Sequence, residues 1–274
     1  MKSTSFVWQR SVVANDDQNP VKLRGLVMRD LVAIVTGGSS GIGREVAITL
    51  AKLGARVLIT ARRQPGIDEV CAQSENIKGI VADVAKAADV QRTVEEAIGL
   101  WGRVDILINN AGAGGIMPLG DATEERIKDI FAVNVVGPSL LAAAALPHLS
   151  GRGGTIINIS STYGHKAAPG FSHYAASKAA LEHLTRCWAL ELAPHGIRVN
   201  AVAAGPTETG ALTGMMGLTA KEAEDVKEYE RNLIPLKRRG APQDVAQWIA
   251  MFANPDTAWT TGQILSVDGG LSVV

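Results

Sequence analysis

Short apolar runs rich in β-branched residues recur along this chain and alternate with segments of helical period. The first run, Leu31 to Val35, ends in a glycine-rich turn, and from Ile42 apolar residues return at helical spacing until Gly54, which stands where a helix C-cap would. Runs of this kind predict seven strands, at residues 31–36, 56–60, 77–82, 104–108, 154–159, 197–202 and 263–267.

The alternation of strands and helices predicts a parallel sheet, because each right-handed crossover lays its helix on one face of the sheet. We therefore predict an α/β fold over residues 28–274: a single-domain, Rossmann-like, doubly wound fold of about seven parallel strands flanked by helices. A chain of 274 residues with 46% hydrophobic content can bury one such core. Ligands of these sheets bind at the carboxyl ends of the strands, where this chain places its polar motifs.

The turn after the first predicted strand reads T-G-G-S-S-G-I-G, residues 36–43. Glycines at a strand-to-helix turn let backbone N–H groups approach a phosphate, and the helix N-terminus supplies partial positive charge. The turn is therefore a candidate dinucleotide site. Its spacing differs from the G-x-G-x-x-G fingerprint, and a tight loop that binds nothing is the alternative interpretation.

A tyrosine and a lysine stand four residues apart in Y-A-A-S-K, Tyr174 and Lys178, thirteen residues after Ser161. On a helix they share one face, so the ammonium can tune the proton affinity of the phenol. A free tyrosine titrates near ~10, and a cation within about 4–6 Å lowers that pKa. The spacing predicts an acid/base pair, although alone it also fits an exposed tyrosine beside a solvated lysine.

Several motifs together resemble the short-chain dehydrogenase/reductase family, over about residues 28–272. They are T-G-G-S-S-G-I-G (36–43), Asp83-Val84, N-N-A-G (109–112), Asn134, Ser161, Tyr174 with Lys178, and V-D-G-G (267–270).

The resemblance implies a catalytic role for four residues. Tyr174 would be the general acid/base, and Ser161 would hydrogen-bond the substrate carbonyl oxygen. Lys178 would lower the tyrosine pKa and bind the nicotinamide ribose, and Asn134 would position a water that relays protons to Lys178.

The resemblance also implies a set of cofactor contacts at the carboxyl ends of the strands. They are Gly37, Ser39, Ser40, Gly41, Ile42, Gly43, Arg62, Asp83, Val84, Asn110, Ala111, Gly112, Tyr174, Lys178, Gly205, Thr207 and Thr209. Asn109 would tie strand ends together, and Asp268 is interpreted as structural. Ala204 replaces the proline that many members carry before Gly205, which predicts a less rigid loop and a less defined position for Thr209.

Cofactor choice depends on the end of the second predicted strand, Thr60-Ala61-Arg62-Arg63. NAD-specific members place an acidic residue where Ala61 stands, and Arg62 could pair with a 2′-phosphate. The sequence therefore predicts NADP(H), with NAD(H) as the alternative. A solvated arginine pair is the interpretation without a cofactor contact.

The predicted substrate is a small carbonyl or alcohol compound, partly apolar. Residues 208–233 combine glycines with Met215 and Met216, which suits a lid that closes on an apolar substrate and also suits a packed surface helix. The C-terminal part most resembles the 3-oxoacyl-acyl-carrier-protein reductase branch, a group of ketoreductases. Sugar, steroid and general alcohol dehydrogenases of the family are alternatives, and a non-catalytic dinucleotide sensor is the alternative from another class.

Net charge, the length of the apolar runs and the histidine spacing argue against nucleic acid, membrane and metal partners. The 27 basic and 27 acidic residues cancel, which argues against nucleic acid and anionic membranes. Leu140 to Leu146 is too short to span a bilayer. The histidines lack metal-ligand spacing, so no metal is predicted. Cys71 and Cys187 lie in helical patterns and are expected to be buried, reduced thiols, which favours a cytoplasmic location.

Two regions concern assembly. Residues 1–27 show no sustained period and are expected to form an N-terminal arm, either flexible or in contact with another subunit. The helical patterns at 122–149 and 173–193 carry apolar residues on more than one face. With the family resemblance, this predicts a homotetramer formed through those helices.

Overall fold

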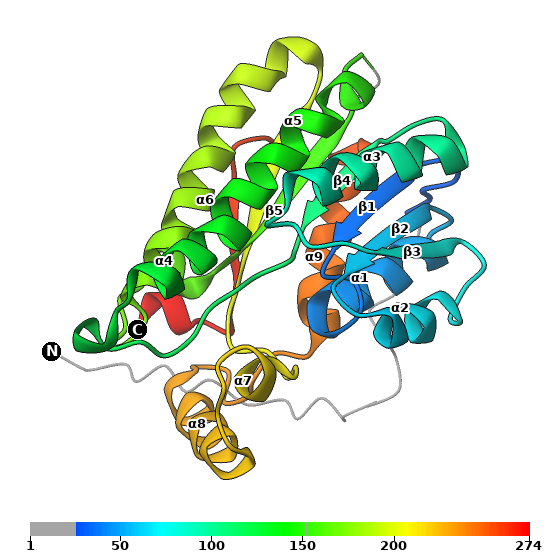
Figure 1. Cartoon of the computed structure of the whole chain (residues 1–274). Coiled ribbons are helices and arrows are strands. Elements are labelled where there is room, and N and C mark those ends of the chain that lie inside the picture. The colour runs from blue at the N-terminus through cyan, green and yellow to red at the C-terminus, as the bar shows by residue number, and fades with distance from the viewer. Residues whose placement is uncertain (1–25, 152) are drawn as a thin grey trace, which may run out of the picture.

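The computed structural model describes residues 26–151 and 153–274 and forms a central sheet covered by helices on both faces (Figure 1). All seven strands are parallel, in the order β3-β2-β1-β4-β5-β6-β7, which confirms the predicted doubly wound fold. Most of the predicted arm, residues 1–25, lies outside the described residues.

The strands coincide closely with the predicted apolar runs. They are β1 Val32–Thr36, β2 Arg56–Ala61, β3 Ile77–Val81, β4 Ile106–Asn109, β5 Thr155–Ser161, β6 Arg198–Ala204 and β7 Ile264–Val267. Every residue of β1, β4, β5 and β6 is buried, as expected for parallel strands covered on both faces. β6 continues through Ala204, which pairs with Val267 of β7, so the residue that replaces the family's proline is held in the sheet.

Each face of the sheet is covered by its own helices and core cluster. α1 (Gly41–Lys52), α2 (Gln64–Cys71) and α9 (Pro242–Ala253) cover one face, and α3 (Ala87–Trp101), α5 (Gly137–Leu149) and α6 (Ser172–Leu192) cover the other. Short 3-10 helices complete the connections, at Leu119–Asp121, Thr162–Gly164, Ala193–His195, Pro255–Thr257 and Leu271–Val273.

One helical stretch is longer than the sequence pattern indicated. α4 (Glu124–Phe131), a π-helical turn (Ala132–Val136) and α5 join into Glu124–Leu149, which by length and composition alone is long and apolar enough to cross a membrane. The expectation based on Leu140 to Leu146 missed this continuity. In the fold, Leu141, Ala145 and Leu149 of the stretch pack in the core cluster beside α3 and the sheet.

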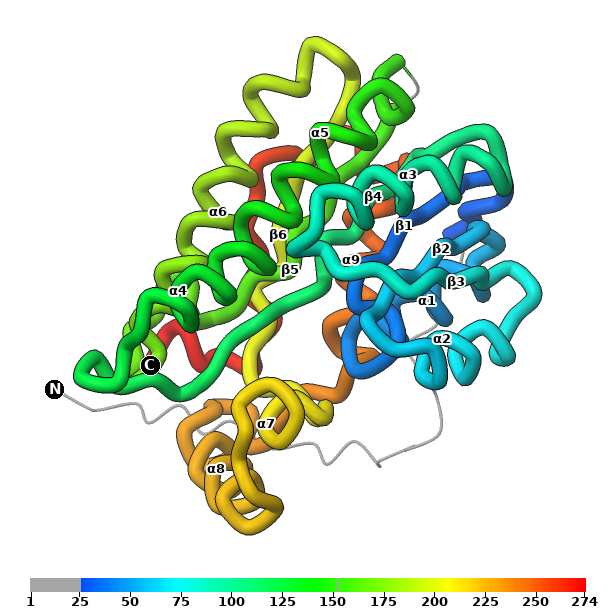
Figure 2. The backbone as a smooth tube through the Cα atoms, viewed as in Figure 1, coloured from blue at the N-terminus to red at the C-terminus, as the bar shows by residue number. Residues whose placement is uncertain are grey.

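The segment predicted as a lid contains two helices that lie beyond the strands at one end of the molecule (Figure 2). They are α7 (Ala211–Gly214) and α8 (Ala220–Leu233), and α8 begins with a capping box between Thr219 and Glu222.

The two cysteines differ from the expectation of buried thiols. Cys187 is exposed on α6, and Cys71 is half-buried at the end of α2, where burial raises the pKa of its thiol. Cys187 does lie on a helix, as its spacing predicted, but on the side of α6 that faces solvent.

Candidate active site

The carboxyl ends of β1, β4, β5 and β6 bring the predicted site residues together. The glycine turn follows β1, Asn110 to Gly112 follow β4, Ser161 ends β5, and Gly205 to Thr209 follow β6. Tyr174 and Lys178 reach the same place from α6, and Asn134 from the π-helical turn.

Glycines determine the conformation of the turn after β1. Gly37 and Gly41 have φ angles of 64° and 54°, which L side chains rarely adopt. A Cβ on Gly43 would lie 2.3 Å from Asn110 Nδ2 and 2.4 Å from the Gly37 oxygen. The turn thus forms a cradle that leads into the N-terminus of α1 with no side chain at its glycine positions, which fits the close approach of a dinucleotide pyrophosphate.

The turn after β4 is bonded to the glycine turn. Asn110 Nδ2 donates to the carbonyl oxygens of Thr36 (2.8 Å) and Gly37 (3.2 Å), and the backbone N–H groups of Asn110 and Ala111 donate to Thr36 Oγ1 (3.0 Å each). The side chain of Asn110 is therefore used to hold the cradle. Asn109 Nδ2 donates to Asn158 Oδ1 at 2.8 Å and ties β4 to β5, as the sequence predicted.

Tyr174 lies buried at the start of α6, against Gly114 and Phe171. A Cβ on Gly114 would lie 2.7 Å from the Tyr174 ring, so this glycine, which sequence reasoning missed, makes room for the phenol. Burial raises the pKa of Tyr174, and a hydrogen bond to Ser161 partly lowers it. Ser161 Oγ also accepts a hydrogen bond from the Tyr163 N–H at 3.3 Å.

Lys178 lies one turn further along α6, and only 4% of it is exposed. Its Nζ donates to the Ile159 carbonyl oxygen at 2.8 Å and lies 5.9 Å from the Tyr174 ring centroid. Burial lowers the pKa of Lys178 to about 8. Burial is the largest effect on the pKa of Tyr174 and raises it, and the lowering of that pKa by Lys178 stays a prediction.

Asn134 is fully buried in the π-helical turn and faces the turn after β4. Its Nδ2 donates to the Ala113 oxygen (2.7 Å) and to Ser177 Oγ (2.9 Å), and its Oδ1 accepts from the Ala113 N–H (2.8 Å). A Cβ on Gly112 would lie 3.7 Å from both Asn134 Oδ1 and Lys178 Nζ, so the two groups flank this glycine. Inserted π-helical turns are common at functional sites, and this one aims Asn134 at the site.

Two further predicted contacts flank the cradle. Thr209 covers it, since a Cβ on Gly41 would lie 3.1 Å from Thr209 Cγ2. Asp83 follows β3, and its Oδ1 accepts a hydrogen bond from the Ala85 N–H at 3.1 Å. Beside it, a Cβ on Gly137 would lie 2.7 Å from the carbonyl oxygen of Val84, so the backbone there packs against the start of α5.

A buried arginine that the sequence did not single out joins the Thr207–Thr209 segment to α8. Arg239 NH2 donates to the Thr207 carbonyl oxygen (2.7 Å), its Nε lies 3.1 Å from Glu208 Oε1, and its NH1 contacts Glu230 of α8. Because Thr207 and its neighbour Glu208 lie far from Arg239 in the sequence, with Thr207 separated from it by 32 positions, no local pattern indicates this cluster. It fixes the predicted lid helix to the loop that carries Thr209.

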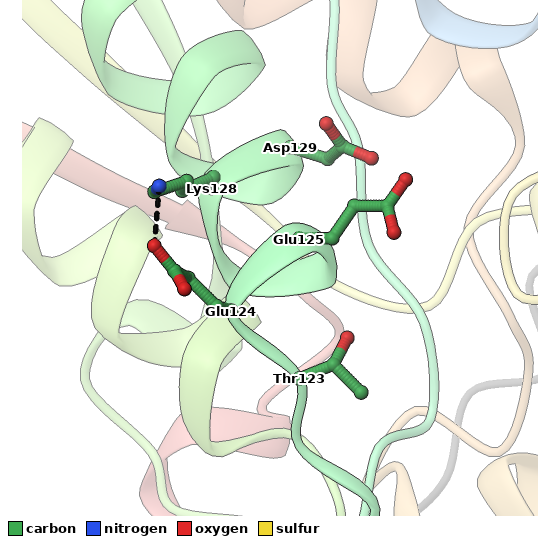
Figure 3. Close-up of a pocket in the computed structure, with 5 residues that line it drawn as sticks. All are labelled: Thr123, Glu124, Glu125, Lys128 and Asp129. Atoms are coloured by element: carbon green, nitrogen blue, oxygen red, sulfur yellow. Dashed lines mark ion pairs between the residues drawn. The ribbon is translucent and has the colours of Figure 1, made fainter.

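A surface hollow at the start of α4 contains none of the predicted site residues. Thr123, Glu124, Glu125, Lys128 and Asp129 line it (Figure 3). Lys128 pairs with Glu124, and the carboxylates of Glu125 and Asp129 point to the other side.

Comparison with known proteins gives matches along nearly the whole chain. Residues 37–272 match the family model described as enoyl-(acyl carrier protein) reductase. The chain is 35% identical over 247 residues to the 3-oxoacyl-[acyl-carrier-protein] reductase FabG of Thermotoga maritima, covering 88% of this chain and 98% of that protein. It is 37% identical over 259 residues to dehydrogenase/reductase SDR family member 4 of Homo sapiens, covering 90% of each.

A solved structure matches equally well. The 3-ketoacyl-(acyl-carrier-protein) reductase of Brucella melitensis, complexed with NADH, has a TM-score of 0.83 and 34% identity, covering 89% of this chain and 99% of that one.

Proposed function

Because the chain belongs to the short-chain dehydrogenase/reductase family of NAD(P)-dependent oxidoreductases acting on CH–OH and C=O groups, we propose that it reduces 3-oxoacyl thioesters or related ketones and prefers NADP(H). The observation that carries the proposal is the buried Tyr174, which lies against Gly114 and stands one helical turn before Lys178 on α6. Burial raises the tyrosine pKa, which keeps the phenol protonated at neutral pH, the form that a reductase needs.

The proposed roles follow from this geometry. The reduced nicotinamide, when bound, supplies the hydride. Tyr174 donates its proton to the substrate oxygen, and the Ser161 hydroxyl hydrogen-bonds the charge that develops there. Lys178 uses one N–H on the Ile159 oxygen, which leaves its other donors for ribose hydroxyls. Asn134, which lies near Lys178 on the other side of Gly112, positions a water that relays a proton from solvent to Lys178.

Aromatic and thioether side chains support a partly apolar substrate. Tyr163 and Phe171 stack with ring centroids 5.0 Å apart, and Phe171 meets Tyr174 edge-on at 6.3 Å. Met215 and Met216 are half-buried in the predicted lid, and methionine adapts to apolar ligands of varied shape. An acyl chain matches these surfaces better than a sugar does. Two relatives, from Thermotoga maritima and Brucella melitensis, are a 3-oxoacyl- and a 3-ketoacyl-acyl-carrier-protein reductase, which supports the same substrate class.

The end of β2 supports NADP(H). Ala61 offers no carboxylate to a ribose, and Arg62 is exposed and has no ion-pair partner among residues 26–151 and 153–274. An unpaired guanidinium suits a 2′-phosphate. The NADH complex of the Brucella melitensis relative makes NAD(H) the alternative cofactor for the test.

A homotetramer in the cytoplasm completes the proposal. Val136, Leu140 and Leu190 are 48%, 39% and 82% exposed on the helices predicted to form the interface, and burial against another copy would remove this apolar surface from water. Light scattering at micromolar concentration should give a tetramer, and a monomer of 28.8 kDa would refute it. The free thiols of Cys71 and Cys187 suit a reducing compartment.

The decisive experiment is a substrate panel with the purified protein, followed by reduced-nicotinamide absorbance. Acetoacetyl-coenzyme A, simple ketones, a sugar and a steroid are each tested with NADPH and with NADH. We expect the highest kcat/KM with the thioester and NADPH. Turnover of only the sugar or the steroid would overturn the substrate class, and no turnover of any compound would favour the dinucleotide sensor.

A further inference from the structure

A buried carboxylate lies directly behind the proposed acid/base pair. Glu182 is 4% exposed and stands one turn after Lys178 on α6. The two side chains contact successive parts of β5: Lys178 Nζ bonds the Ile159 oxygen at 2.8 Å, and Glu182 Oε1 accepts from Ser160 Oγ at 2.7 Å. The residue after Ser160 is Ser161, so the carboxylate also fixes the strand end that carries the proposed oxyanion partner.

The surroundings of Glu182 are built to hold a carboxylate. A Cβ on Gly164 would lie 2.5 Å from Glu182 Oε1, so only glycine leaves room there. His165 Nδ1 lies 3.2 Å from the same oxygen, and His165 Nε2 lies 3.2 Å from Ser266 Oγ on β7. This network assigns the proton to Nδ1 when the imidazole is neutral, since a carboxylate only accepts.

We propose that Glu182 is a positioning residue of the reaction, the buried counter-charge that keeps the Lys178 ammonium protonated where it meets the cofactor. This rests on the proposed role of Lys178 in binding the nicotinamide ribose.

Among the described residues, the charged groups on the other elements around α6 are exposed or bonded elsewhere. α4 packs against α6, and its charged side chains are all exposed: Glu124, Glu125, Arg126, Lys128 and Asp129. β5, the 110–114 turn and the π-helical turn carry no ionisable side chain, and Arg198 of β6 bonds carbonyl oxygens at Phe252, Asn254 and Thr260. Further titratable groups beside Glu182 and Tyr174 are His165 and Tyr163. Burial lowers the pKa of Lys178 to about 8, and the charge of Glu182 acts in the opposite direction. Without Glu182, a larger share of Lys178 would be neutral at physiological pH.

The test measures Lys178 through cofactor binding in a Tyr174→Phe background, which removes the titration of the phenol. NADPH affinity, followed by its fluorescence from about pH 6 to about pH 10, should weaken around the Lys178 pKa. Adding Glu182→Gln should move this midpoint down by about one unit or more, because a nearby opposite charge shifts a pKa by about 1–3 units. Glu182→Asp, which keeps the charge, should leave it near the parent value.

Further variants keep the result decisive. Glu191→Gln, an exposed site on the same helix, should not move the midpoint. If Glu182→Gln does not fold, Glu182→Met removes the charge with an apolar chain of similar length and predicts the same shift. A midpoint unchanged in the variant that folds would overturn the role of Glu182. Affinity that does not weaken with pH in the parent, or is unchanged by Lys178→Met, would instead overturn the proposed role of Lys178.

Discussion

The side-chain amide of Asn134 makes two hydrogen bonds to the backbone of Ala113: Oδ1 accepts from the Ala113 N–H at 2.8 Å, and Nδ2 donates to the Ala113 C=O at 2.7 Å. This pair of bonds joins the π-helical turn to the segment after β4, twenty-one residues earlier. A Cβ on Gly112 would lie 3.7 Å from Lys178 Nζ, and one on Gly114 would lie 2.7 Å from the Tyr174 ring, so Asn134 fixes the segment that runs beside both groups.

Asn134→Ala should therefore lower both stability and turnover. Leaving the Ala113 N–H and C=O without partners should cost about 1–3 kcal/mol of unfolding free energy. Because displacement by about 1 Å can cost about 10²-fold in rate, kcat should fall by more than tenfold even in the folded fraction. Denaturant unfolding and steady-state kinetics measure the two effects. Asn232→Ala, at an exposed position of α8, is the matched control.

Tyr174→Phe should abolish most turnover and leave cofactor affinity nearly unchanged, because it removes only the transferable proton. General acid/base catalysis contributes about 10²–10⁴ in rate. Single-turnover reduction and NADPH titration separate the two quantities. A loss smaller than about tenfold would show that another group supplies the proton.

Gly43→Ala should weaken cofactor binding and destabilise the fold. The new Cβ would lie 2.3 Å from Asn110 Nδ2 and 2.4 Å from the Gly37 oxygen, so the cradle must shift. Gly99→Ala on α3 is the matched control, since nothing lies within 4 Å of its Cβ, and alanine in a helix should add about 0.5–1 kcal/mol of stability. Equal effects of the two substitutions would contradict the role of the turn.

The strands could be predicted because parallel strands are buried on both faces and read as continuous apolar runs. The predicted strand 154–159 ends two residues before β5 does, because Ser160 and Ser161 are polar although they pair with β6. The contacts of Arg239 could not be predicted, because Glu208 and Glu230 approach it only through tertiary packing. The burial of Tyr174 could not be predicted from the sequence either. Burial raises the pKa of the phenol, whereas the Y-x-x-x-K spacing alone suggests a lower pKa.

Arg62→Ala should reduce kcat/KM with NADPH and leave that with NADH nearly unchanged. A hydrogen bond to a charged group contributes about 1.5–3 kcal/mol, which corresponds to about a ten- to hundredfold preference. Arg63→Ala is the neighbouring control, and Ala61→Asp should move the preference toward NADH. The cofactor hypothesis fails if the unmodified enzyme favours NADH, or if Arg62→Ala weakens both cofactors equally.

Lys178→Met should inactivate the enzyme and stabilise its fold at neutral pH. Burial lowers the pKa of Lys178 from its ordinary 10.5 to about 8, so the unfolded chain binds the proton more tightly than the folded one. The resulting penalty is fully present below about pH 8 and disappears as the pH rises toward about 10.5. At about 1.4 kcal/mol per pKa unit the penalty is about 3 kcal/mol, and the lost bond to the Ile159 oxygen offsets about 1 kcal/mol of the gain.

Denaturant unfolding should show Lys178→Met more stable by about 2 kcal/mol near pH 7, with a smaller difference near pH 10. The exposed Lys52→Met should change stability by less than about 0.5 kcal/mol at either pH. A Lys178→Met variant that is less stable than the parent near pH 7 would show that the ammonium stabilises the fold it is buried in.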